Sequence, residues 1–247
     1  MLSSIWTGRT GITSSQIKME SISNNIANSG TTGYKKTEVS FSETLKQNIR
    51  TSNGVPFTSD RDMIHGTGVR ASNSFRNLDQ GVFITTGRDT DAAINGDGYF
   101  KVIDSKGEAF YTRDGNFSVD MSGNIVHNAS GMILEVAGID KANVKQPLAI
   151  GPDGTIVCDK KTVGKINLYD FAYKNEMLSK GDNLFSAGDR PIATDAKIVA
   201  GYLEGSNVNM VDELTSMITT QRSYEFNART IKAADEMWQM INNLKNR

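Results

Sequence analysis

Two rows of apolar residues, one near each end of the chain, constrain the fold more than any other feature of this sequence. The row near the C-terminus repeats every seven residues, at Met210, Met217, Tyr224, Ile231 and Trp238. A second row, Leu214, Gln221 and Ala228, lies four residues after one member of the first row and three residues before the next. Because no Pro or Gly follows Asn209, this heptad pattern predicts one long helix over 209–245 with a coiled-coil seam.

The N-terminal row has the same period and consists of Ile5, Ile12, Met19 and Ile26. It predicts a helix over 2–28, and the glycines at 8 and 11 would let a second helix approach it closely. We therefore expect the two terminal helices to pair as a coiled-coil stalk that carries the middle of the chain as a head. The alternative is two ordinary amphipathic helices packed on a globular core.

Residues 72–202 have the pattern of an antiparallel β meander. Short runs rich in aromatic and β-branched residues alternate with Gly-containing turns such as Asp97-Gly98. Strands are expected at 82–85, 92–94, 99–103, 109–112, 117–119, 125–126, 132–136, 148–150, 155–157, 165–171 and 198–203, and a loop at 174–190. The predicted fold class is α+β, in four segments. These are an N-terminal stalk helix (1–35), a connecting extension (36–70), a β head (71–203) and a C-terminal stalk helix (204–247).

Composition narrows the functional classes. The chain has 247 residues and a formal net charge of −1, so electrostatics favour neither nucleic acid nor an anionic membrane. No apolar run approaches the roughly 18 residues of a membrane helix, and the N-terminus lacks the apolar region of a secretory signal peptide. With one cysteine, Cys158, no internal disulfide is expected, and the thiol is interpreted as structural. His65 and His127 are expected in surface loops.

No catalytic motif is present: the sequence has no G-x-S-x-G, P-loop or H-E-x-x-H pattern. We expect a non-enzymatic protein that needs no cofactor and no metal. Two competing classes remain open at this point. One is a soluble β-rich binding module with a coiled-coil oligomerisation stalk. The other is an enzyme whose active site lies within 137–195.

A specific resemblance to a known family appears near both ends of the chain and in its middle. The pattern Ser23-x-Asn25-Ile26-Ala27-Asn28-x-x-Thr31-x-Gly33-Tyr34, followed by two lysines, resembles the N-terminal signature of bacterial flagellar rod and hook proteins. The closing motif of that family is similar to 204–209, 213–214 and 221–225 taken together. The segments 93–100 and 111–117 resemble blocks of the family's head domain. The order along the chain also matches.

This resemblance implies a structural subunit of the flagellar basal-body rod. Such a subunit polymerises into a helical tube that transmits motor torque to the hook and forms part of the export channel. The extension at 36–70 has a length similar to that of the family's distal rod member, which favours this member over a proximal rod or hook subunit. The expected location is the basal body, outside the cytoplasm, reached without a cleaved signal peptide.

The resemblance also implies partners and interface residues. The expected partners are copies of the chain itself, neighbouring rod and hook proteins, the flagellar export apparatus and outer ring proteins; nucleic acid and membrane insertion are not expected. The expected subunit-interface residues are Ile5, Ile12, Met19, Asn25, Ile26, Asn28, Gly33, Tyr34, Leu214, Met217, Gln221, Tyr224, Ala228, Ile231 and Trp238.

Overall fold

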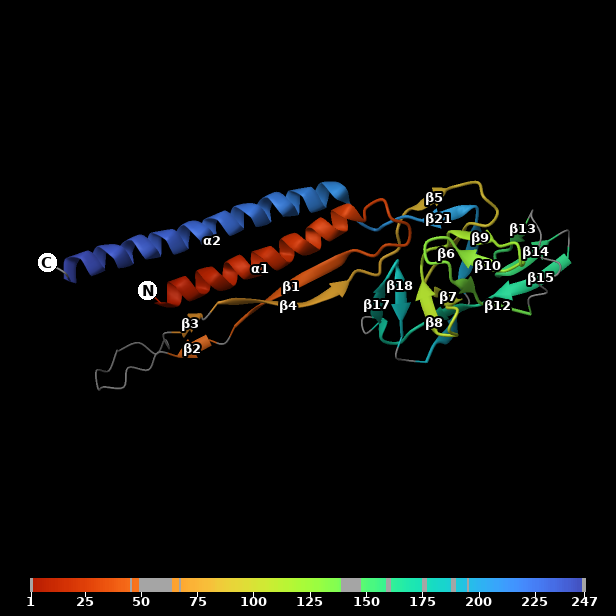
Figure 1. Ribbon diagram of the computed structural model, residues 1–247, viewed down its shortest axis with the longest axis horizontal. Helices are drawn as coiled ribbons and strands as arrows, with labels where there is room; N and C mark the ends of the chain where they lie inside the picture. The colour runs from red at the N-terminus through yellow and green to blue at the C-terminus, as the bar shows by residue number, and fades with distance from the viewer. Residues whose placement is uncertain are drawn as a thin grey trace. The chain divides into compact units, whose positions relative to one another are not determined.

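The computed structural model describes residues 2–44, 46–48, 64–66, 68–138, 148–158, 161–174, 177–187, 190–194 and 196–245. The chain forms two compact units (Figure 1). The helical unit comprises Met1–Ala27, Thr37–Phe75 and Asn209–Arg247. The β unit comprises Asn28–Lys36 and Arg76–Val208. The predicted α+β class is confirmed, because two terminal helices pack together and antiparallel strands form the middle of the chain.

The helical unit is built on two long helices that lie side by side in Figure 1. α1 spans Leu2–Ala27 and α2 spans Met210–Lys245, each within one residue of the predicted bounds. Asn209 caps α2, because its side-chain Oδ1 accepts a hydrogen bond from the Val211 N–H at 3.1 Å. The helices are antiparallel: Gly8 of α1 lies against Ile231, whereas Asn25 reaches Glu213.

Two rows of α2 residues were predicted to face α1. The first row is as predicted, but the second lies one residue earlier in the sequence than predicted. Met217, Tyr224 and Ile231 are half-buried, as the seven-residue repeat predicts, but Leu214 is 46% exposed and Gln221 is also exposed. The row between them consists of Glu213, Thr220, Asn227 and Ala234, which are buried or half-buried. The sequence pattern favoured Leu214 for its hydrophobicity, whereas the folded chain uses small and hydrogen-bonding side chains at these positions.

Two glycines explain why small and polar residues occupy this seam. A Cβ atom at Gly8 would lie 2.9 Å from Cγ1 of Ile231, and one at Gly11 would lie 2.7 Å from Nδ2 of Asn227. Such distances are shorter than a van der Waals contact, so any larger residue would have to displace its neighbour. The helices therefore approach closely along this part of the seam.

A β ribbon accompanies α1 in the helical unit (Figure 1). β1 (Thr37–Glu43) pairs with β4 (Val69–Arg76), and β2 (Lys46–Asn48) pairs with β3 (Ile64–Gly66). The Ser14 hydroxyl donates to the Val69 carbonyl at 3.4 Å, and the Lys18 ammonium lies 5.6 Å from the Phe41 ring centre. The expected connecting extension thus contributes regular structure on both sides of 49–63, which lie outside the described residues.

The β unit contains short strands whose pairings are antiparallel. Its strands are β5 (Phe83–Thr85), β6 (Ala92–Asn95), β7 (Tyr99–Ile103), β8 (Ala109–Thr112), β9 (Phe117–Val119), β10 (Ile125–His127), β11 (Ile133–Leu134), β12 (Val136–Ala137), β13 (Leu148–Ile150), β14 (Thr155–Cys158), β15 (Lys161–Ile166), β16 (Leu168–Asp170), β17 (Leu178–Gly181), β18 (Leu184–Ser186), β19 (Ile192–Thr194), β20 (Lys197–Ala200) and β21 (Tyr202–Glu204). The largest sheet has the order β17-β18-β8-β7-β11-β10-β9, with β16 and β19 added beside β7.

Aromatic and aliphatic side chains fill the interior of the β unit. The rings of Phe100 and Phe117 meet edge to face with centroids 5.2 Å apart, and both side chains are fully buried. Cys158 is buried in the same core, which confirms its interpretation as a structural thiol. A second cluster gathers Tyr99, Tyr111, Phe171, Met177 and Phe185.

Sequence reasoning missed one hairpin, the strand β19 and several strand ends in this unit. The expected loop at 174–190 contains β17 and β18, which are joined by a turn with Asp182 and Asn183 at φ values of 49° and 56°. Turns with two such residues match the twist of hairpin strands, although no Gly occupies these two positions. Three predicted strands are each divided in two, at Glu135, Asn167 and Gly201.

We predict that Gly11→Leu weakens the pairing of the two helices. The new side chain would enter the space of Asn227, and overpacking of this kind costs about 1–3 kcal/mol. Thr13→Leu is the control, because Thr13 is exposed on the same helix. Amide hydrogen exchange in α1 should accelerate in the Gly11 variant alone. Equal exchange in the two variants would contradict the close approach of the helices.

Candidate assembly surfaces

The N-terminal residues predicted to form an interface lie mostly within the helical unit's own packing. Ile5, Ile12, Met19 and Ile26 are half-buried. Asn25 is 1% exposed: its Nδ2 donates to the Thr37 carbonyl at 2.9 Å and to a Glu213 carboxylate oxygen at 3.2 Å, and its Oδ1 accepts the Thr37 N–H at 2.9 Å. Asn25 therefore joins the end of α1, the start of β1 and the first turn of α2.

α2 presents a different surface, because many of its large apolar side chains face outward. Of the predicted residues, Leu214 is 46% and Trp238 is 49% exposed, Gln221 is exposed, and Met217, Tyr224, Ala228 and Ile231 are half-buried. The other exposed large apolar residues of this helix are Met210, Val211, Ile218, Phe226, Met237, Met240, Ile241 and Leu244. So many exposed large apolar side chains grouped on one helix indicate an interaction surface.

Part of this exposure follows from the unequal lengths of the two helices. α2 has 36 residues and α1 has 26. Since Gly8 lies against Ile231 and the helices are antiparallel, α1 begins near Trp238. About two turns at the end of α2 therefore extend beyond α1. Ile241 and Leu244 lie in this extension.

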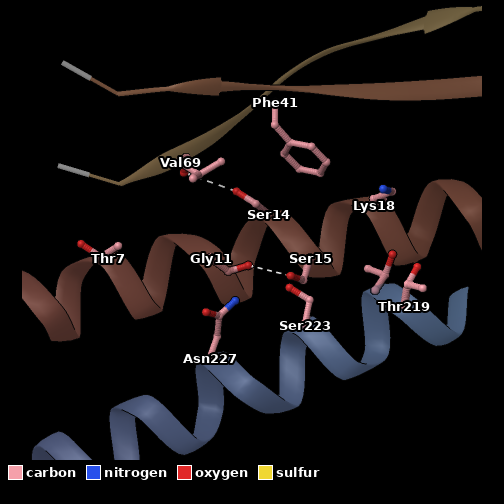
Figure 2. A pocket seen from close by; sticks show the side chains of 11 residues that line it. Thr7, Gly11, Ser14, Ser15, Lys18, Phe41, Val69, Thr219, Ser223 and Asn227 are labelled. Atoms are coloured by element: carbon pink, nitrogen blue, oxygen red, sulfur yellow. Dashed lines mark hydrogen bonds between the residues drawn. The ribbon is translucent and has the colours of Figure 1, made fainter. Parts of the chain in front are cut away.

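A groove opens between α1, α2 and the ribbon of β1 and β4 (Figure 2). Its volume is about 440 Å³, and it is lined by Thr7, Gly11, Ser14, Ser15, Lys18, Phe41, Val69, Thr219, Thr220, Ser223 and Asn227. The hydroxyls of Ser15 and Thr220 donate to carbonyls of their own helices, at 2.8 and 2.7 Å. These two residues therefore offer mainly carbon atoms to the groove.

The remaining predicted interface residues lie in the β unit. Gly33 has a φ of 67°, its N–H donates to the Glu204 carbonyl at 2.7 Å, and a Cβ there would lie 2.7 Å from the backbone nitrogen of Asp114. Only glycine fits this position without strain. Asn28 and Tyr34 are half-buried in the same loop.

A buried charge cluster stands next to this loop. Lys35 Nζ donates to Glu204 Oε1 at 2.6 Å, and Arg113 donates to Glu204 Oε2 at 3.3 Å. Gly81 N–H donates to the same Oε1 at 3.0 Å, and Lys35 also donates to the Asp79 carbonyl at 2.7 Å. The three charged side chains are at most 4% exposed. We call Lys35, Arg113 and Glu204 the buried cluster.

Asn207 adds a second connection between the same segments. Its Oδ1 accepts the Lys36 N–H at 2.7 Å, and its Nδ2 donates to the carbonyls of Asn77 and Asp79, at 2.9 and 3.1 Å. The segments 28–36, 76–81 and 204–208 are therefore fixed together. The sequence motifs at the two ends of the chain meet here. Pairing of the two ends was expected, but the ion pair of Lys35 with Glu204 was not, because these two residues are far apart along the chain.

Burial sets the protonation behaviour of this cluster. Removal of Lys35 from water disfavours its charged form and lowers the pKa of its ammonium group below the usual 10.5. The negative charge of Glu204 and its hydrogen bond to Lys35 oppose that shift, but they do not cancel it.

His127 is fully buried, so its predicted position in a surface loop is wrong. Its Nδ1 lies 2.8 Å from the Ser130 hydroxyl, and its Nε2 lies 3.2 Å from Oδ2 of Asp114. Asp114 also accepts a hydrogen bond from the Thr32 hydroxyl at 2.9 Å. Because both ring nitrogens are engaged and the ring is shielded from solvent, we interpret this arrangement as structural rather than catalytic.

The described residues offer neither a metal site nor a membrane-spanning helix. No group of three or more His, Cys, Asp or Glu side chains there could hold a metal ion. No described helix combines the length and the apolar character needed to cross a membrane.

Three family models match this chain. The model for "Flagella basal body rod protein" matches residues 5–35, and that for "Flagellar hook protein FlgE/F/G D1 domain" matches 93–158. The model for "Flagellar basal body rod FlgEFG protein C-terminal" matches 199–244. The order of the matches places the chain in the class of flagellar rod and hook structural proteins.

Relatives matched along the whole chain narrow this class. The FlgG basal-body rod proteins of Buchnera aphidicola subspecies Acyrthosiphon pisum and Schizaphis graminum are 36% and 34% identical; in both cases the match covers 99% of this chain and 100% of the relative. The FlgF basal-body rod protein of Caulobacter vibrioides is 35% identical over 89% of this chain and 88% of its own length. The chain belongs to the flagellar basal-body rod protein FlgG family. The expectation of a non-enzymatic distal rod protein is thereby confirmed.

We predict that Glu204→Gln strongly destabilises the β unit. The substitution removes the carboxylate charge that Lys35 and Arg113 share. Because the other partner of Arg113, Asp97 at 3.9 Å, is 71% exposed, we expect a cost of about 3–5 kcal/mol. Glu135→Gln is the control: Glu135 pairs with Lys101 at 2.8 Å but is 30% exposed, so its loss should cost at most about 1 kcal/mol. Urea unfolding of the full chain measures both. Similar losses in the two variants would contradict the role of burial.

We also predict a pH dependence from Lys35. Its pKa is lowered in the folded chain and returns to about 10.5 on unfolding, so between these values the unfolded state binds more protons. The free energy of unfolding should therefore rise with pH in this alkaline window, relative to a Lys35→Met variant. Urea unfolding of both proteins between about pH 8 and the usual lysine pKa tests the sign. A wild-type advantage that shrinks as pH rises would contradict it.

Proposed function

We propose that this chain polymerises into a helical tube that forms the distal part of the flagellar rod, transmits motor torque to the hook and encloses part of the export channel. The observation that carries this proposal is the exposed apolar surface of α2. A helix with this many outward apolar residues requires further partners besides α1. Membership of the FlgG family supports copies of the same chain as those partners.

An open tube requires contacts that do not close on themselves. When one surface of a subunit binds a different surface of the next subunit, the same contact can repeat indefinitely and produces a helical filament. In this proposal Leu214, Gln221 and Trp238 contact neighbouring copies directly. Ile5, Ile12, Met19, Asn25, Ile26, Met217, Tyr224 and Ile231 position the helices that carry those contacts.

The other proposed partners are neighbouring rod and hook proteins at the two ends of the tube, the export apparatus and outer ring proteins. The proposed location is the basal body outside the cytoplasm, where the rod crosses the cell envelope. The competing class, a β-rich binding module with an oligomerisation stalk, would form a discrete oligomer in place of a rod.

We predict that Leu214→Asp abolishes rod assembly. Thr215→Asp is the matched control, since it places the same charge on the adjacent exposed residue. A charge in a desolvated contact costs several kcal/mol, whereas one facing water costs little. Each variant is expressed in cells lacking the native gene. Motility and rods in isolated basal bodies should be lost only in the Leu214 variant, while its circular dichroism remains unchanged.

Two other outcomes would contradict the proposal. If Leu214→Asp cells swim normally and contain complete rods, this surface of α2 is not an assembly surface. If the wild-type chain itself is absent from basal bodies and forms a discrete oligomer in solution, the binding-module class is the correct one.

A further inference from the structure

Apart from Met210, Trp238 and Ile241, which continue the a and d rows at the two ends of the helix, the exposed large apolar residues of α2 form two separate rows, each with coiled-coil spacing. In the heptad that describes the seam with α1, Met217, Tyr224 and Ile231 are a positions and the buried Glu213, Thr220 and Ala234 are d positions. The first stripe lies at b and e and consists of Val211, Leu214 and Ile218. The second stripe lies at c and g and consists of Phe226, Ala233, Met237, Met240 and Leu244.

The two stripes occupy opposite flanks of the seam and opposite halves of the helix. Beyond Ile218, the b and e positions are Gln221, Glu225, Ala228, Lys232, Asp235, Gln239 and Asn242. Before Phe226, the c and g positions of α2 are Asp212, Ser216, Thr219 and Ser223. Each flank therefore has one apolar half and one largely polar half, and the order of the halves is reversed between the flanks.

We propose that the first stripe of one copy packs against the second stripe of α2 in the next copy. The two α2 helices are parallel and shifted along their axes by about three heptads, or roughly 30 Å. This inference rests on the proposed function, because it identifies the surface through which the copies assemble and fixes their stagger.

Several observations favour a second α2 as the occupant of each stripe. Both complementary stripes are on this one helix. The outer surface of α1 lacks such a row: among its described side chains, the exposed large apolar residues are Trp6 and Ile17, which are too far apart for one stripe. In part of its polar half, the c and g flank instead lines the groove beside β1 and β4, through Thr219 and Ser223 (Figure 2).

The position of the stripes also argues against two simpler parallel pairings. Parallel helices without a shift would place each apolar half against a polar half. A parallel two-fold pair would bring the same flank of both helices together and leave the other stripe exposed. Contact between a b and e flank and a c and g flank is heterologous, so each copy can bind one neighbour on either side.

A charge-rescue experiment tests the stagger in cells lacking the native gene. Ile218→Lys should reduce the number of complete rods by at least about tenfold, because it puts a cation in the proposed contact. Adding Met240→Glu on the same chain should restore most of the loss, since each Lys would meet a Glu of the next copy. Adding Thr219→Glu instead is the matched control, and it should restore nothing because it lies beside Ile218 without a shift.

Disulfide trapping gives a second readout that does not depend on rescue. In a Cys158→Ser background, Ile218→Cys with Met240→Cys should give a ladder of cross-linked chains in isolated basal bodies. Ile218→Cys with Thr219→Cys should give none. A ladder or rescue only for the unshifted pair would overturn the inference, as would complete rods with neither ladder nor rescue for the shifted pair.

These outcomes separate the inference from the function on which it rests. If rods assemble normally from the Cys variants and only the ladder is missing, the proposed function stands and the stagger is wrong. If the unmodified chain does not enter basal bodies, both proposals fail.

Discussion

The close approach of α1 and α2 is the constraint on which the helical unit depends. Gly8 and Gly11 leave room for Ile231 and Asn227, and Asn25 reaches across to Glu213. The seam is consequently narrow, and much of it is small or polar. A narrow polar seam buries less apolar surface than a row of leucines would, so the pairing of the two helices gains less free energy from hydrophobic burial than most coiled coils do.

Because small and polar residues of α2 face α1, its large apolar side chains lie on its outer surface. Leucine and methionine residues that would fill an ordinary coiled-coil core lie instead on its flanks, where Leu214 and Met240 are about half exposed. Intrachain packing thus uses small and hydrogen-bonding residues, and the large apolar residues remain available for other chains. The arrangement suits a subunit whose terminal helices gain most of their stabilisation from assembly.

Sequence periodicity predicted the two helices to within a residue, because apolar residues that repeat every seven positions over such a length have few solutions other than a helix. It also predicted β7, β8 and β9 with their observed bounds. The periodicity could not identify which α2 residues face α1. Leu214 was predicted because it is hydrophobic, whereas the structure buries the neighbouring Glu213, which accepts a hydrogen bond from Asn25. Contacts between distant segments, such as Lys35 with Glu204, leave no periodic signal in the sequence.

The buried cluster joins the sequence motifs at the two ends of the chain through direct contacts. Glu204 is fully buried and accepts hydrogen bonds from Lys35, Arg113 and the Gly81 N–H, so loss of its carboxylate charge would leave two buried cations without the partner that they share. A buried ion pair adds little net stability over a well-packed apolar contact, but it tolerates few alternative geometries. In a rod subunit under torque, such a cluster would keep three chain segments in one arrangement, whereas apolar contacts can slide and repack.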